Sequence, residues 1–82
     1  MRTAREALAE VDAMWRRSIE DHAAARRAFA DAKSELSLAD ERSTPGAVLK
    51  VESAAVEVRI ANARRAAFGQ AREIVAELPE PR

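Results

Sequence analysis

The chain has no cysteine and no tyrosine, and only one histidine and one tryptophan among its 82 residues. The absence of cysteine excludes disulfide bonds, thiolate chemistry and the commoner structural zinc sites. His22 has no second histidine to share a metal ion with, so the sequence predicts no metal ligands and no cofactor. Only two glycines are present, which leaves no glycine-rich phosphate-binding loop. We therefore expect no catalytic residues, no small-molecule substrate and a protein that is not an enzyme.

The chain also lacks a net charge and a long apolar run. Its 14 basic residues balance 14 acidic ones, whereas a dedicated nucleic-acid-binding protein usually carries a basic excess. No stretch is apolar enough over enough residues to span a membrane, and the first residues contain no apolar run of signal-peptide length. We expect a cytoplasmic protein that does not bind a membrane.

Alanine is the most abundant residue. Twenty of the 82 residues are alanine and only nineteen are larger apolar residues. Alanine favours helix and fills little volume, so the composition predicts an all-α fold with closely approaching helices. The length allows one small domain, covering residues 1–82.

A seven-residue apolar repeat runs through the first half of the chain. One core position of this repeat holds Leu8, Trp15, His22, Phe29 and Leu36, and the other holds Ala4, Val11, Ser18, Ala25, Ala32 and Ala39. Such a repeat keeps one seam of a helix facing a partner helix.

The helix boundaries follow from capping and turn residues. Thr3 followed by Glu6 matches a capping box and predicts a first helix over about 4–42, although the weak helix formers near Ser37 leave open an earlier end. The interruption at 43–46 contains Thr44, which we expect to cap the next helix, and Pro45 in its first turn. The second helix is predicted over about 45–78 and a frayed tail over 79–82. A connection this short predicts an antiparallel two-helix hairpin.

The second helix carries two apolar stripes on nearly opposite sides, and the first helix can cover only one of them. The stripe assigned to the intrachain core includes Val51 and Val58, which join Leu8, Val11, Trp15, His22, Phe29 and Leu36. The other stripe is the candidate self-association face, and it consists of Leu49, Val56, Ile60, Ala63, Ala67 and Ile74. We expect this face to pair with a second copy, which would give a homodimeric four-helix bundle.

Two residues of the seam could serve a function instead of the core. His22 could be a pH-sensitive or partner-recognising site, but its core position favours a register-setting role with Ser18 or a cross-helix partner. Trp15 could be an exposed binding anchor, but its place on the seam favours burial against the second helix.

Arginines supply the candidates for polar recognition, which are Arg16, Arg17, Arg26, Arg27, Arg65 and Arg72. Acidic residues alternate with the first two doublets at helical spacing, which favours local ion pairs on a solvated face. Arg65 and Arg72 interrupt the core stripe of the second helix and either lie beside Val11 and Trp15 or mark where a charged partner docks.

The sequence therefore predicts a non-enzymatic protein–protein interaction module, such as an adaptor, a small regulatory or accessory subunit, or an inhibitor. Its predicted partners are a second copy and another protein, bound through helical surfaces. The alternative is a small helical protein associated with nucleic acid through the arginine doublets.

Overall fold

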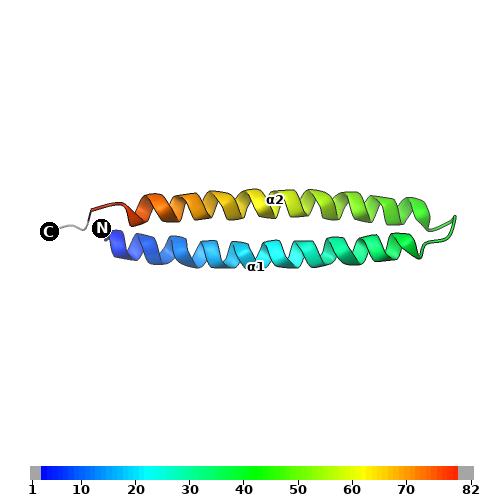
Figure 1. Ribbon diagram of the computed structural model, residues 1–82, viewed down its shortest axis with the longest axis horizontal. Coiled ribbons are helices and arrows are strands. Elements are labelled where there is room, and N and C mark those ends of the chain that lie inside the picture. Colours follow the sequence, from blue (N-terminus) through cyan, green and yellow to red (C-terminus); the bar gives the residue numbers. More distant parts are fainter. Residues whose placement is uncertain (1–2, 80–82) are drawn as a thin grey trace.

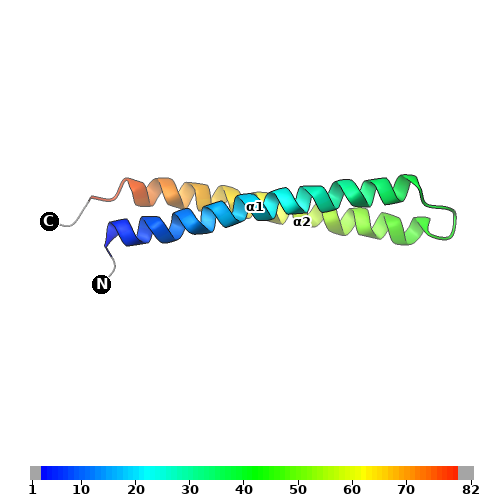
Figure 2. The ribbon, with the colours of Figure 1, turned by 90° about the horizontal axis from the view of Figure 1, so that it is seen from below.

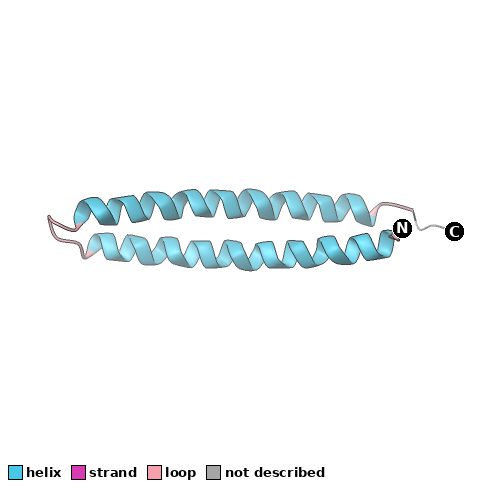
Figure 3. Cartoon of the chain, turned by 180° about the vertical axis from the view of Figure 1, so that it is seen from behind, coloured by secondary structure: helices cyan, strands magenta, loops and turns pink. Residues whose placement is uncertain are grey.

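The computed structural model describes residues 3–79, which form two long helices joined by one loop. Helix α1 spans Ala4–Ser37 and α2 spans Thr44–Ala76. They run antiparallel and lie side by side over their whole length (Figures 1 and 3). The predicted all-α helical hairpin is confirmed.

The hairpin is a thin rod. Its extents are 67 × 17 × 13 Å and its radius of gyration is 18.6 Å, against about 12 Å for a compact domain of this length. The two helices cross at a shallow angle near their middles, as Figure 2 shows. Over residues 3–79, neither helix contains an apolar stretch long enough to cross a membrane.

Helix α1 begins where the capping residues predict. The Thr3 hydroxyl accepts a hydrogen bond of 3.1 Å from the backbone N–H of Glu6. This bond satisfies one of the backbone donors that the first helical turn leaves unpaired.

Helix α1 ends at Ser37, five residues before the predicted end at Arg42. The Ser37 hydroxyl donates a hydrogen bond of 2.9 Å to the carbonyl of Ser34. Serine side chains that bond to the backbone compete with helix formation, and Leu38 then closes the last turn with its own N–H. The earlier end at Ser37 was one of the two outcomes that the sequence left open.

The connection lies at 38–43, earlier than the predicted turn at 43–46. Ser43, not Thr44, occupies the N-cap position of α2, so the predicted cap is wrong. The Thr44 hydroxyl instead donates to the carbonyl of Asp40 at 2.6 Å. Pro45 lies in the first turn of α2, as predicted. Helix α2 ends at Ala76, two residues before the predicted Leu78, and the predicted tail lies, apart from Pro79, outside the described residues.

The loop is held by reciprocal bonds between Asp40 and Ser43. The Asp40 carboxylate accepts from the Ser43 backbone N–H at 2.9 Å and from its hydroxyl at 3.0 Å. The Ser43 hydroxyl oxygen accepts from the Asp40 N–H at 3.1 Å. These donors, the backbone N–H of Ser43 first among them, hold the pKa of Asp40 below its ordinary value of 3.8.

Replacing Asp40 with alanine should lower the melting temperature of the hairpin at neutral pH but not in acid. Because the folded-state pKa is depressed, the carboxylate stabilises the fold at pH values above 3.8. This contribution is lost as the pH falls through the folded-state pKa. The difference between the Asp40→Ala variant and the unmodified chain should therefore shrink below pH 3.8 in thermal unfolding followed by circular dichroism. Glu41→Ala, which removes the same charge from the same loop, is the control, and an Asp40→Ala difference that is independent of pH would contradict the assignment.

Small residues lie at the closest approach of the helices. Among residues 3–79, only Ser18, Ala32 and Ala47 are buried. The eight residues of the predicted intrachain core are all half-buried; they are Leu8, Val11, Trp15, His22, Phe29, Leu36, Val51 and Val58. One helix can cover only one side of another, so two helices alone enclose very little.

Candidate interaction surface

Helix α2 has one covered side and one exposed side. The side against α1 holds the half-buried residues Val51, Ala54, Ala55, Val58, Ala61, Phe68 and Val75. The opposite side holds Leu49, Val56, Ile60, Ala63, Ala67 and Ile74, all of which are exposed. We call these six residues the α2 outer face.

The α2 outer face is unusually apolar for a solvated helix surface. Leu49 is 64% exposed, Ile74 is 58% exposed, and Val56 and Ile60 are each 47% exposed. The face extends over 25 residue steps from Leu49 to Ile74, which is roughly 37 Å along the helix. An exposed apolar patch of this length is typical of an interaction site.

Charged residues border the α2 outer face on both edges. Lys50, Glu57 and Arg64 follow one edge at seven-residue intervals, and Glu52, Arg59 and Glu73 follow the other; all six are exposed. Lys50 also reaches α1, where its ammonium lies 3.0 Å from the carboxylate of Glu35. The apolar strip is therefore flanked by charges of both signs, as are the seams along which helices pair.

The interior seam between α1 and α2 contains a polar contact at its middle. Arg65 of α2 places Nη1 3.2 Å from Nδ1 of His22 on α1. A guanidinium can only donate, so Nδ1 accepts and the ring proton of a neutral His22 lies on Nε2. The structure thus gives His22 a cross-helix partner, whereas the hydroxyl of Ser18 donates to the carbonyl of Trp15 at 2.6 Å.

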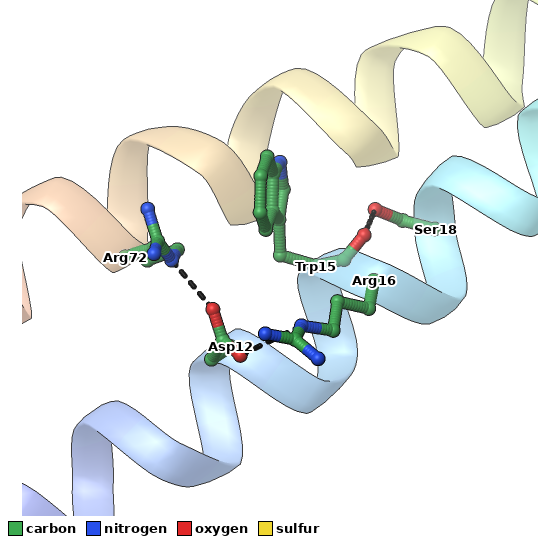
Figure 4. A network of polar contacts seen from close by, with 5 residues as sticks. All are labelled: Asp12, Trp15, Arg16, Ser18 and Arg72. Atoms are coloured by element: carbon green, nitrogen blue, oxygen red, sulfur yellow. Dashed lines mark hydrogen bonds and ion pairs between the residues drawn. The ribbon is translucent and has the colours of Figure 1, made fainter.

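A second polar cluster lies near the open end of the hairpin (Figure 4). Asp12 of α1 accepts from Nε of Arg72 on α2 at 2.6 Å and from Nε of Arg16 at 2.9 Å. The guanidinium of Arg72 lies 4.7 Å from the ring centroid of Trp15, which adds a cation–π contact to the ion pair. The cluster connects both helices through side chains that remain partly exposed.

Gly69 makes room for the indole ring. A Cβ atom at position 69 would lie 3.3 Å from Nε1 of Trp15 and 3.6 Å from its Cδ1. Since α2 continues unbroken through this position, the glycine serves close approach of the helices and not a break in α2. Trp15 is half-buried in the seam.

The structure divides the six candidate recognition arginines into two groups. Arg16, Arg65 and Arg72 contact Asp12, His22 or Trp15 of their own chain. Arg17, Arg26 and Arg27 are exposed on α1. The six do not form one continuous basic surface on a single element, because four are on α1 and two on α2.

Within the described part of the chain, the grooves between the helices are open, and no group of three or more metal-binding side chains is assembled. One such groove is lined by Ser18, Asp21, Ala25, Glu57, Ile60, Ala61 and Arg64. Ile60 of the α2 outer face thus lies in the same groove as Ser18 and Asp21 of α1.

No protein-family model, curated protein or solved structure matches the chain.

Sequence reasoning did not identify Asp12 and Glu35 as cross-helix partners. The spacing of Asp12 and Arg16 indicates an ion pair within α1. No spacing within one helix, however, indicates that Arg72 lies beside Asp12, because that contact depends on how far α2 is shifted along α1.

Proposed function

We propose that this chain is a non-enzymatic protein–protein interaction module that works as a homodimer. In this proposal the chain acts through its helical surfaces as an adaptor, a small regulatory or accessory subunit, or an inhibitor. The observation that carries the proposal is the α2 outer face, whose four large apolar residues are 47–64% exposed along almost the whole helix.

The exposed area of a single chain supports a partner of substantial size. The chain exposes 6616 Å², whereas a compact monomer of this mass exposes about 4,900 Å². The excess of roughly 1,700 Å² falls in the range that one subunit of an obligate homodimer buries. A thin hairpin thus offers the surface that a second hairpin needs.

A second copy is the occupant that the α2 outer face favours. Two-fold pairing is the commonest way in which one apolar patch covers another, because each subunit presents the same patch to its partner. The dimer would cover the α2 outer face and leave exposed surface of α1 for another protein.

The solution mass of the purified chain tests the proposal. Light scattering behind a sizing column should give about 18 kDa, twice the 9.0 kDa of one chain. Because dimer formation depends on concentration, the measurement should be repeated over an approximately tenfold dilution. A well-folded helical chain that keeps the mass of one copy at every concentration would overturn the proposal.

A further inference from the structure

The α2 outer face is symmetric about its own centre. Its six residues follow one another at intervals of 7, 4, 3, 4 and 7 positions. Leu49 and Ile74 are equally far from the peptide bond between Ala61 and Asn62; the same holds for Val56 with Ala67, and for Ile60 with Ala63. A pattern that reads the same in both directions is complementary to itself when the second helix runs the opposite way.

We propose that two copies pair through antiparallel α2 helices, with the two-fold axis passing beside the Ala61–Asn62 peptide bond. This inference rests on the proposed function and adds the orientation and register of the dimer. In this register, Ile60 of one copy lies against Ala63 of the second copy. Val56 lies against Ala67 in the same way, and Leu49 against Ile74.

Side-chain size agrees with this register. Each of the four central layers combines one alanine with one β-branched residue, which is Ile60 or Val56. Large residues facing small ones interdigitate at constant helix separation. A parallel dimer would instead put Ile60 against Ile60 and Ala63 against Ala63, so that crowded layers at Val56 and Ile60 would be followed by underfilled layers at Ala63 and Ala67.

Two symmetry-related polar layers lie within the apolar strip. Ser53 and Gln70 continue the same seam, are exposed, and are equally far from the Ala61–Asn62 peptide bond. In the antiparallel register, the Ser53 hydroxyl faces the Gln70 amide of the second copy, and these groups can hydrogen-bond to each other. Such a polar pair, which the two-fold axis repeats once, costs some stability and specifies the register.

The charges along the edges also favour the antiparallel dimer. In an antiparallel pair, each edge faces the same edge of the second helix, so Glu57 lies about 3 Å along the axis from Arg64 of the second copy. This opposite-charge pair occurs twice, as does the solvated like-charge pair of Glu52 and Glu73 on the other edge. A parallel pair would face opposite edges and would place Glu52 near Glu57 and Arg59 near Arg64, all of them like-charge pairs.

Disulfide cross-linking tests the register, because the chain has no cysteine of its own. Val56→Cys and Ala67→Cys are made as separate variants, mixed under reducing conditions and then oxidised. In the proposed dimer, position 56 of one copy lies beside position 67 of the other. Two copies of position 56 lie about 16 Å apart along the axis, as do two copies of position 67, which is too far for a disulfide. The mixture should therefore give at least about tenfold more cross-linked product than either variant alone.

The outcomes separate this inference from the proposed function. Equal cross-linking of each variant alone, or none in the mixture, at a solution mass of two chains would overturn the register and leave the homodimer intact. A solution mass of one chain for the unmodified protein would overturn both. Circular dichroism of the two variants establishes that each retains its helices.

Discussion

Replacing Ile60 with glutamate should reduce the solution mass from about 18 kDa to the 9.0 kDa of one chain. Ile60 lies on the α2 outer face, 47% exposed in a single hairpin, and occupies a central layer of the proposed dimer. Two-fold symmetry would bury two unpaired carboxylates there, and each buried ion costs several kcal/mol. A total of about 5 kcal/mol or more corresponds to a dimer dissociation constant raised more than about a thousandfold. We expect a monomer with reduced thermal stability.

Met14→Glu is the matched control for this prediction. Met14 is another large apolar residue, 52% exposed, but it belongs to α1 and lines the groove beside Arg64 and Phe68, so it is not one of the six residues of the α2 outer face. The same change in charge and polarity at this position should leave the solution mass equal to that of two chains. If Ile60→Glu keeps the mass and helicity of the unmodified chain, the α2 outer face is not the dimer interface. If both variants become monomers, the loss is not specific to that face.

Replacing Ser18 with leucine should destabilise the hairpin itself. Ser18 is the most buried side chain among the described residues, with 2% of its surface exposed, and it lies where the helices approach closely. Extra methylene groups in such a position cost about 1–3 kcal/mol because neighbouring side chains and backbone must move. For a chain of this size, that loss lowers the melting temperature by about 4–8 °C per kcal/mol.

Two further serine variants separate volume from polarity. Ser18→Ala removes the hydroxyl, which bonds only to the Trp15 carbonyl of the same helix, and should change the stability far less than Ser18→Leu. Ser34→Leu introduces the same leucine at an exposed position of α1 and should stay within about 0.5 kcal/mol of the unmodified chain. Thermal unfolding must be compared at one protein concentration, since dimer formation raises the melting temperature. Equal melting temperatures for Ser18→Leu and Ser34→Leu would mean that Ser18 is not at a tight contact.

The Ser18 and Ile60 predictions differ because one residue lies in the contact between helices of one chain and the other in the proposed contact between two chains. Ser18 belongs to the seam that folds one chain, so its replacement acts on the helicity of the hairpin. Ile60 belongs to the face that one chain leaves uncovered, so its replacement acts first on the association of two chains. The mass and the melting temperature, measured on the same samples, therefore report on different contacts.

Helical periodicity was enough to establish which residues share a side of each helix. Every α-helix has about 3.6 residues per turn. The residues of the seven-residue repeat, such as Leu8 and Leu36, must therefore lie along one side of α1, and Val51 and Ile60 must lie on different sides of α2. The start of α1 was equally local, because Thr3 satisfies a donor only three residues away. These features required no knowledge of the second helix.

The polar pairs that connect the two helices could be established only from the folded hairpin. The contacts of Asp12 with Arg72 and of His22 with Arg65 depend on the axial register of the two helices. That register is set by the loop, where the bonds between Asp40 and Ser43 replace the five further helical residues that we predicted for α1. Five residues of helix correspond to about 7 Å, more than the reach of a hydrogen bond. Periodicity repeats along one helix and is local, whereas a contact between two helices depends on the geometry of the chain that joins them.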